Sequence, residues 1–173
     1  MSSNLKKTLV LTGMMGVGKT TIGNLLSNHL SIKLIDLDKE IEKKLSLSIS
    51  EIFKIKGEKY FREIEEKETI KYLKNQNQVI ALGGGGFLNK KIRENINKLC
   101  ISIWLDLDPK IIFNRTINND KRPLLGNIKT VEELNNIYKL RKNVYSLADY
   151  RIDCNSKTKD EIIREIAKIY ESI

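Results

Sequence analysis

The chain has 173 residues, of which 40% are hydrophobic and 31% are charged, and its formal net charge is +9 at pH 7. This composition is typical of a globular protein and argues against a disordered or fibrous chain, and the length suits one domain over residues 1–173. No apolar run approaches the roughly 20 residues that a membrane-spanning helix needs. The single histidine argues against histidine-based metal sites, and the spacing of Cys100 and Cys154 predicts two reduced core thiols. We therefore expect a cytoplasmic protein.

The positive charge has two interpretations. A basic surface attracts phosphate, so a nucleic-acid-binding module is one of them. However, the lysines are scattered through helical stretches rich in Ile, Asn and Lys, without a basic run and with few aromatic residues between them. This pattern favours solvated faces that help to attract small anions. We expect neither nucleic acid nor membrane as a partner.

Apolar runs typical of β-strands alternate with helical patterns along the chain. Helix starts are marked by capping boxes at Ser48, Thr130 and Thr158, and by Asp108 followed by Pro109. Strands that read as continuous apolar runs between helices predict an α/β fold whose parallel sheet is covered on both faces. The runs are TLVLTG, KLIDLD, QVIALG, CISIWLDLD and YRIDC, which begin at residues 8, 33, 78, 100 and 150.

The segment GMMGVGKT, residues 13–20, fits the pattern G-x-x-x-x-G-K-[ST] between a predicted strand and a predicted helix. Its glycines let successive N–H groups hold phosphate oxygens, and the helix dipole adds positive potential. We expect Lys19 to reach the β- and γ-phosphates and the Thr20 hydroxyl to ligate Mg²⁺. The sequence thus predicts a nucleoside triphosphate site formed by Gly13, Met14, Met15, Gly16, Val17, Gly18, Lys19, Thr20 and Thr21.

The use of the triphosphate is indicated by two carboxylates in LIDLD. A GTPase switch is disfavoured because the guanine-reading pattern N-K-x-D and the switch pattern D-x-x-G are both missing. In a small-molecule kinase, one carboxylate can support the metal and the other can meet the acceptor hydroxyl. Asp36 and Asp38 would share one face of an extended strand end. The alternative is an acidic strand end in which Asp38 caps the next helix.

Arginine is scarce, since only seven of the 31 basic residues are Arg. Arg62 can form a two-bond fork to a carboxylate, and Glu65 would share its helix face. Arg122 lies in the polar stretch 118–129, which predicts a mobile loop that could carry positive charge to a transferring phosphoryl group. Arg141 follows in a helical stretch. For each of these arginines a surface ion pair is the common alternative.

The segment VIALGGGG ends in four consecutive glycines, Gly83 to Gly86. It follows a predicted parallel strand, and ligands of open α/β sheets bind at the carboxyl ends of such strands. Glycine lets the backbone N–H groups approach a ligand because no Cβ intervenes. We therefore expect a ligand to approach the backbone of this run closely, whereas the fourth glycine, Gly86, can begin a helix.

Together these motifs resemble the shikimate kinase family over essentially the whole chain. The matching pieces are GMMGVGKTTIG, LIDLD, SISEIFKIKGEKYFREIE, ALGGG, RPLL and RKNVY. The resemblance implies a three-layer P-loop NTPase fold with a five-stranded parallel sheet, a substrate-binding helical segment at about 38–75 and a mobile lid at about 115–128. It also implies Mg²⁺-dependent transfer of the ATP γ-phosphoryl group to the 3-hydroxyl of shikimate in aromatic amino-acid biosynthesis, by a monomer.

The resemblance also implies roles for single residues. Asp38 would contact the acceptor hydroxyls, Asp36 would support Mg²⁺ with Thr20, and Arg122 would act with Lys19 on the transferring group. Arg115 would lie against adenine, and Lys157 stands where relatives can carry an arginine. The shikimate site would comprise Arg62 and Arg141 on the carboxylate, Glu65 orienting Arg62, Phe53 and Phe61 walling the ring, and the backbone of Gly83, Gly84 and Gly85.

Three points stay open from the sequence. Asn143 replaces a proline that often follows Arg141 in the family, and the next segment is about one residue short, so the aim of Arg141 is undetermined. Asp38 is either a general base or only an orienting group. A related kinase for another small hydroxy acid, such as gluconate, and a nucleotide-responsive nucleic-acid-binding module are the alternative functions, although two arginines with Phe53 and Phe61 favour a cyclic hydroxy acid.

Overall fold

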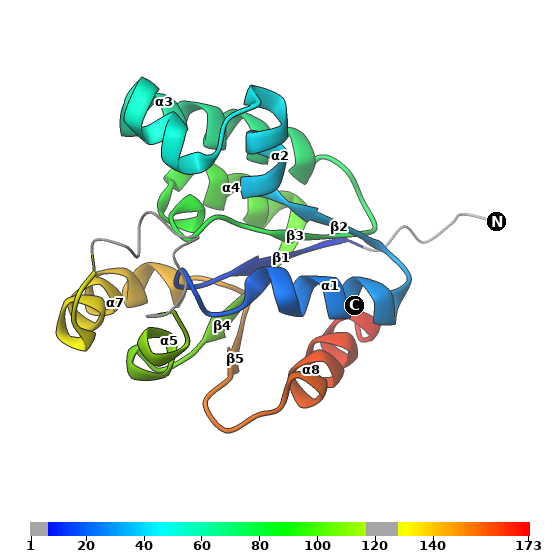
Figure 1. The fold of residues 1–173 in the computed structure, drawn as a ribbon. Coiled ribbons are helices and arrows are strands. Elements are labelled where there is room, and N and C mark those ends of the chain that lie inside the picture. The colour runs from blue at the N-terminus through cyan, green and yellow to red at the C-terminus, as the bar shows by residue number, and fades with distance from the viewer. Residues whose placement is uncertain (1–6, 117–127) are drawn as a thin grey trace.

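The computed structural model describes residues 7–116 and 128–173. A five-stranded sheet lies between two layers of helices (Figure 1). The strands follow the order β2-β3-β1-β4-β5, and every pair is parallel. This confirms the predicted three-layer fold and its five strands, which are β1 (Thr8–Thr12), β2 (Lys33–Asp36), β3 (Gln78–Ala81), β4 (Cys100–Asp106) and β5 (Tyr150–Asp153).

Helices cover both faces of this sheet. The helices are α1 (Lys19–Leu30), α2 (Leu37–Leu45), α3 (Ile49–Leu73), α4 (Lys90–Leu99), α5 (Pro109–Thr116), α7 (Val131–Tyr145) and α8 (Lys159–Glu171), with a 3₁₀ turn η1 (Gly86–Leu88). Helices α1 and α8 pack together on one face, and α3 and α4 pack together on the other (Figure 1). Within α3 the backbone breaks helical geometry at Gly57, whose φ is 83°.

The helix starts follow the predicted side-chain chemistry with one difference. Complete capping boxes form at Ser48 and Thr158, as predicted. At Thr130 only half of the box forms: the hydroxyl accepts a hydrogen bond from the Glu133 N–H at 3.2 Å, but the Glu133 carboxylate accepts one from the Lys129 N–H instead. The carboxylate therefore satisfies the backbone one residue before the expected position.

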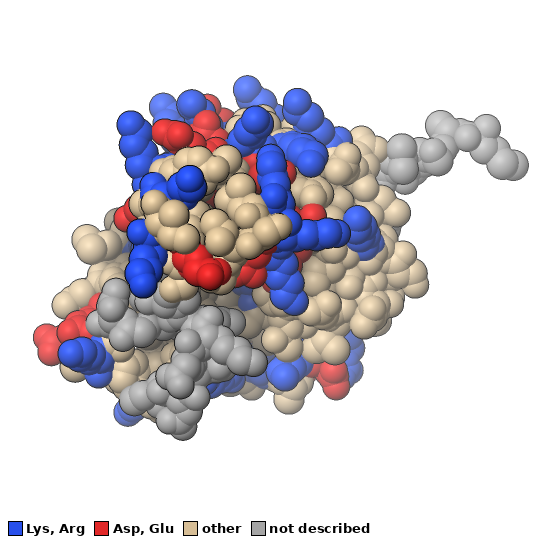
Figure 2. All heavy atoms as spheres, turned by 45° about the horizontal axis from the view of Figure 1, so that its top comes forward, with Lys and Arg blue, Asp and Glu red and all other residues tan. Residues whose placement is uncertain are grey.

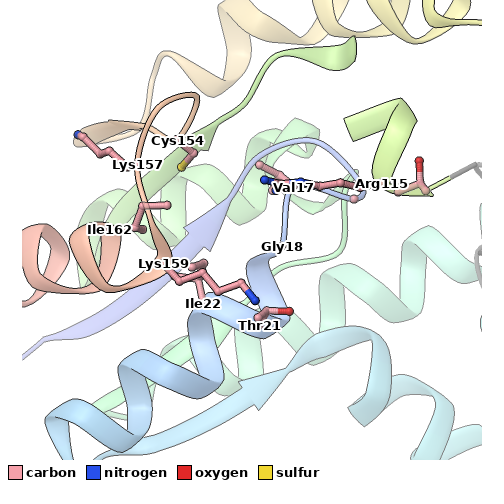
Figure 3. Close-up of a pocket in the computed structure, with 11 residues that line it drawn as sticks. Val17, Gly18, Thr21, Ile22, Arg115, Cys154, Lys157, Lys159 and Ile162 are labelled. Atoms are coloured by element: carbon pink, nitrogen blue, oxygen red, sulfur yellow. The ribbon is translucent and has the colours of Figure 1, made fainter. Parts of the chain in front are cut away.

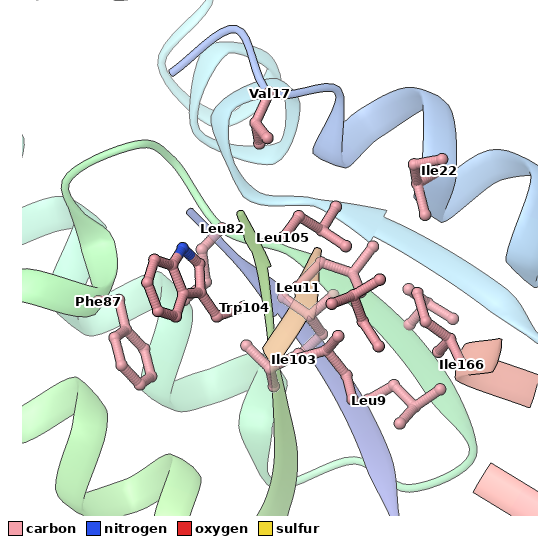
Figure 4. Close-up of a cluster of buried hydrophobic side chains, with 14 of the residues drawn as sticks. Leu9, Leu11, Val17, Ile22, Leu82, Phe87, Ile103, Trp104, Leu105 and Ile166 are labelled. Carbon is pink, nitrogen blue, oxygen red and sulfur yellow. The ribbon is translucent and has the colours of Figure 1, made fainter. Parts of the chain in front are cut away.

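Two hydrophobic clusters hold the structure together. The larger one fills the space between the sheet and its helices, and Figure 4 shows Leu9, Leu11 and Ile103 from neighbouring strands within it. A smaller cluster of Ile41, Ile52 and Phe61 joins α2 to α3. Burying such side chains contributes about 1.5–3 kcal/mol each. The α2–α3 segment thus has a small apolar centre separate from that of the sheet.

The cysteines and the surface charges agree with the sequence-based interpretation. Cys100 and Cys154 are buried free thiols, and burial raises the pKa of Cys100 to about 12 and that of Cys154 to about 11. In Figure 2, Lys and Arg side chains cover the face formed by α2 and α3 with Asp and Glu between them. In the described ranges, no helix is both long and apolar enough to cross a membrane.

Candidate active site

Three functional segments meet at one edge of the sheet. The glycine-rich phosphate loop follows β1, the two aspartates lie at the end of β2, and the glycine run follows β3. Because these three strands are neighbours and parallel, their carboxyl ends lie side by side. Open α/β sheets bind ligands at such an edge.

Glycines determine the backbone conformation of the phosphate loop, and the Lys19 side chain makes hydrogen bonds to its backbone. Gly13 and Gly18 have φ values of 135° and 105°, which side-chain-bearing residues rarely adopt. The Lys19 Nζ donates hydrogen bonds to the carbonyl oxygens of Gly13 at 2.8 Å and Met14 at 2.9 Å. The side chains of Met14 and Val17 are buried in the core. Their side chains therefore cannot contact a phosphate, and the Val17 N–H already donates to the Met14 carbonyl oxygen at 3.3 Å.

A cavity of about 390 Å³ lies beside this loop (Figure 3). Arg115, which was predicted to lie near adenine, lines it, and so does Lys157. The Lys157 Nζ is 2.5 Å from the Glu165 Oε2. Lys159, the first residue of α8, also lines the cavity. The sequence analysis did not identify it, because no sequence motif indicates that α8 packs beside α1. The cavity is lined by Gly16, Val17, Gly18, Thr21, Ile22, Arg115, Thr116, Cys154, Lys157, Lys159 and Ile162.

Thr20 and Asp36 form a direct contact between α1 and the end of β2. The Thr20 hydroxyl donates to the Asp36 Oδ2 at 2.6 Å. Both groups offer oxygen, the ligand that Mg²⁺ prefers. No cluster of three or more His, Cys, Asp or Glu side chains suited to a metal occurs in the part of the chain that the structure describes. The chemistry of the two oxygen donors thus fits Mg²⁺.

The predicted conformation of Asp38 is wrong. Helix α2 begins at Leu37, so Asp38 lies in its first turn and not on an extended strand end. Asp36 caps this helix by accepting a hydrogen bond from the Lys39 N–H at 3.3 Å, a role that the sequence analysis considered for Asp38. Because Asp36 caps α2 in place of Asp38, the helix begins two residues earlier in the chain than a cap at Asp38 would allow. The two carboxylates stay close enough for the charge of Asp36 to act on Asp38.

Asp38 lies in an electrostatically unfavourable position for a carboxylate. Burial, together with the nearby charges of Asp36 and Glu65, raises the pKa of Asp38 to about 6, and Lys19 opposes this shift. A Cβ atom on Gly83 would lie 2.6 Å from the Asp38 Oδ1. Gly83 thus lets the carboxylate reach the end of β3.

Arg62 is held by two acidic residues on α3. Its Nη1 donates to the Glu65 Oε2 at 2.7 Å, and its Nε and Nη2 donate to the Glu58 Oε1 at 3.3 and 3.2 Å. These bonds use three of the five guanidinium N–H donors and leave one on each Nη nitrogen. These two remaining donors can bind a carboxylate. Sequence reasoning missed Glu58, although its spacing of four residues was a usable signal.

The two predicted wall residues contact one another. The ring centroids of Phe53 and Phe61 are 4.8 Å apart, and the Arg62 guanidinium carbon lies 5.2 Å from the centroid of the Phe61 ring. Phe61 is buried with Ile41 in the smaller cluster, whereas Phe53 is half-buried. Phe61 therefore mainly supports Arg62 and Phe53 from behind.

Helix α7 faces the glycine run through two side chains. The Arg141 Nη1 lies 3.4 Å from the Gly84 carbonyl oxygen, and the Tyr145 hydroxyl donates to the same oxygen at 2.7 Å. The helix continues through Asn143 to Tyr145, so the missing proline does not turn Arg141 away. Sequence reasoning missed Tyr145, although it follows Arg141 by four residues and so shares its helix face. Burial raises the pKa of the Tyr145 hydroxyl, so it remains a donor at neutral pH.

The glycine run is needed for close approach and not for unusual backbone angles. None of its residues has a positive φ, and Gly86 begins η1 as predicted. A Cβ on Gly84 would lie 3.1 Å from the Met15 Cβ of the phosphate loop. A Cβ on Gly85 would lie 2.6 Å from the Arg62 Nη1. Site side chains and the phosphate loop thus occupy the space that side chains of these glycines would need.

One predicted catalytic residue, Arg122, lies outside the described residues, as does most of the predicted lid at about 115–128. Of that range the structure describes Arg115 and Thr116 at the end of α5, and Ile128 before α7.

Comparisons with known proteins agree with this geometry. A family model described as shikimate kinase matches residues 15–171. A shikimate kinase of Sulfurihydrogenibium sp. is 38% identical over 160 residues, which cover 92% of this chain and 95% of the relative. One of Thermoanaerobacter pseudethanolicus is 39% identical over 164 residues, which cover 95% of this chain and 96% of the relative.

The comparison with solved structures also finds shikimate kinases. Shikimate kinase from Acinetobacter baumannii in complex with shikimate aligns with a TM-score of 0.90 at 30% identity, covering 96% of this chain and 94% of that one. A gluconokinase from Sinorhizobium meliloti aligns with a TM-score of 0.59 at 14% identity, which shows a likeness of fold alone. The chain therefore belongs to the shikimate kinase family.

Proposed function

We propose that this chain transfers the γ-phosphoryl group of ATP to the 3-hydroxyl of shikimate, giving shikimate 3-phosphate and ADP. The observation that carries the proposal is the convergence of a phosphate loop, Asp38, Arg62 and Arg141 on one glycine run in a chain of this family. A nucleotide cavity on one side and two arginines on the other provide for both substrates.

Arg62 and Arg141 together bind the shikimate carboxylate. They come from α3 and α7, and both lie against the glycine run, since Arg62 packs on Gly85 and Arg141 on Gly84. Two cations that face one backbone segment suit a compact anionic ring. An open-chain sugar acid such as gluconate would extend its carboxylate farther from its reacting hydroxyl, and the distant gluconokinase likeness does not favour it.

The phosphate loop binds the triphosphate, with the base in the adjoining cavity. Arg115 and Lys157 line that cavity and supply positive charge to the nucleotide. Lys19 lies within the loop and acts on the β- and γ-phosphates. Residues 117–130 connect α5, which carries Arg115, to α7, which carries Arg141. Arg122 lies outside the described residues, and its role at the transferring phosphoryl group rests on the resemblance of its segment RPLL to the family pattern.

Thr20 and Asp36 would hold Mg²⁺. Their hydrogen bond and their oxygen donors support this assignment. When bound, the ion neutralises charge on the β- and γ-phosphates. The capping bond from Lys39 to Asp36 also fixes the carboxylate relative to α2.

Asp38 orients the acceptor hydroxyl. With a pKa of about 6 it is ionised at neutral pH and accepts a hydrogen bond from the 3-hydroxyl. The hydroxyl oxygen then forms a bond to the γ-phosphorus in line with the breaking bond to ADP, and late in the step the hydroxyl proton passes to the Asp38 carboxylate that accepts its hydrogen bond. A loose transition state requires little deprotonation beforehand, so positioning by Asp38 is its main contribution.

The regiochemistry tests this proposal directly. The product formed from ATP, Mg²⁺ and shikimate is examined by ³¹P and ¹H NMR, and we expect one phosphomonoester on the 3-oxygen. Phosphate on another hydroxyl would contradict the proposed position of Asp38.

We also propose that the protein acts as a monomer in the cytoplasm. The two buried free thiols support a reducing compartment. Sedimentation velocity at micromolar concentration tests the monomer, because a dimer would contradict it.

A further inference from the structure

The carbonyl oxygen of Gly84 is the point at which α7 meets the glycine run. It accepts a short hydrogen bond of 2.7 Å from the Tyr145 hydroxyl and a long one of 3.4 Å from the Arg141 Nη1. Typical N–H···O distances are about 2.9–3.0 Å, so Arg141 is at the outer limit of a hydrogen bond. The tyrosine is thus the main partner of this oxygen.

Tyr145 is built rigidly into the structure. Its side chain is fully buried, and its ring stacks on that of Trp104 with centroids 6.2 Å apart. A buried hydroxyl requires a partner, and the Gly84 carbonyl provides it across 61 residues of sequence. The fixed ring therefore fixes the carbonyl in return.

A fixed carbonyl also fixes the next amide. Peptide groups are planar and trans here, so the N–H of Gly85 points away from the side that the Gly84 carbonyl faces. In the described part of the chain, the N–H groups of Gly84 and Gly85 donate to no protein acceptor. The Gly85 N–H is therefore a donor held in one direction, on the side opposite α7.

We propose that Tyr145 is a positioning residue for shikimate binding, acting through the Gly84 carbonyl on both Arg141 and the Gly84–Gly85 peptide. This inference rests on the proposed function. Because the hydroxyl satisfies the carbonyl, the Arg141 guanidinium keeps its donors for the substrate carboxylate. Without the hydroxyl, Arg141 is the remaining donor near that oxygen and moves onto it, since a charged donor forms the stronger bond.

The test is Tyr145→Phe, which removes one oxygen and keeps the stacked ring. We expect the KM for shikimate to rise about 3- to 10-fold, the size of one hydrogen bond, while the KM for ATP changes less than twofold. The matched control is Tyr170→Phe, because Tyr170 is also a buried tyrosine, and its hydroxyl donates to Asn77 far from the site. We expect Tyr170→Phe to lower the melting temperature about as much as Tyr145→Phe does, but to leave the KM values for shikimate and ATP unchanged.

Binding can be followed without turnover. Trp104 is the only tryptophan and contacts the Tyr145 ring, so its fluorescence reports a shikimate titration of either variant. A Kd for shikimate that rises with the KM supports the proposal. Unchanged Kd and KM in Tyr145→Phe, or equal increases for shikimate and ATP, would overturn it.

A double-mutant cycle separates action through Arg141 from general destabilisation. In an Arg141→Gln background, adding Tyr145→Phe should weaken shikimate binding by a smaller factor than it does in the wild-type background, because only the effect through the Gly84–Gly85 peptide remains. Additive effects would contradict the route through Arg141. If the wild-type protein released no ADP with shikimate, the proposed function would fail instead, so the two failures are distinguishable.

Discussion

Arg62 and Glu65 form an ion pair one helical turn apart on α3, with the Nη1 and Oε2 atoms separated by 2.7 Å and the Glu65 side chain only 3% exposed. Burial raises the pKa of Glu65, and the neighbouring guanidinium opposes that shift. The guanidinium thus favours the charged form of this buried carboxylate, and the carboxylate holds the arginine in one orientation.

Arg62→Lys tests the two-bond carboxylate fork. Lysine retains the charge but cannot present two parallel N–H groups. We expect the KM for shikimate to rise about 10- to 100-fold, which corresponds to the 1.5–3 kcal/mol of a charged hydrogen bond, with the KM for ATP nearly unchanged. Steady-state kinetics with each substrate varied in turn measure this. A fall in turnover at unchanged KM for shikimate would contradict the assignment.

Glu65→Gln tests the orienting role of the buried partner. Glu58 contacts the same arginine but its side chain is 66% exposed, so Glu58→Gln is a matched control. Since exposed ion pairs contribute about 0–1 kcal/mol, the control should change the KM for shikimate by less than about fivefold. Glu65→Gln should raise it by more than the control does. Equal effects from both variants would show that burial of Glu65 does not matter.

Asp38→Asn should stabilise the protein while reducing activity. The folded-state pKa of about 6 lies above the ordinary value of 3.8, so the folded protein binds the proton more tightly than the unfolded chain between those values. The contribution of Asp38 to the free energy of unfolding therefore falls as pH rises through this window, by up to about 3 kcal/mol. The variant should melt at a higher temperature than the wild type at pH 7.5, and the difference should shrink towards pH 4. Thermal melts of both proteins between pH 4 and pH 7.5 measure this difference. A variant that is less stable than the wild type at pH 7.5 would contradict the raised pKa, and one with normal turnover would contradict the role of Asp38.

Lys157→Gln tests the nucleotide side of the site. Lys157 lines the cavity beside Arg115, whereas Lys168 lies exposed on α8 and makes Lys168→Gln the control. We expect the Kd for ADP to rise about 3- to 10-fold in the first variant, as for one hydrogen bond, and to stay within twofold in the control. Isothermal titration calorimetry measures both. Equal affinities in the two variants would remove Lys157 from the nucleotide site.

Local patterns determined what the sequence could predict. The phosphate loop lies between a strand and a helix within a short stretch, and Arg62 and Glu65 interact across one helical turn, so spacing alone brings each set together. The central strands β1, β3 and β4 are buried at every position, and such strands of a parallel sheet read as apolar runs.

Two kinds of feature could not be predicted from local patterns: the choice between Asp36 and Asp38 as the cap of α2, and contacts that form only when helices pack together. Whether Asp38 continues β2 or begins α2 is decided by which aspartate caps the helix, and both have the right chemistry. Tyr145 reaches Gly84 only because α7 packs against η1, and Lys159 reaches the cavity only because α8 packs against α1. Such contacts join segments far apart in the chain, where no spacing rule applies.

The central claim is tested most directly by coupled measurement of ADP release with ATP and Mg²⁺, comparing shikimate, gluconate, a nucleoside monophosphate and no acceptor. The account predicts release that depends on shikimate and saturates with it, with little release in the other three reactions. Faster release with gluconate or with the nucleoside monophosphate, or release that needs no acceptor, would contradict it.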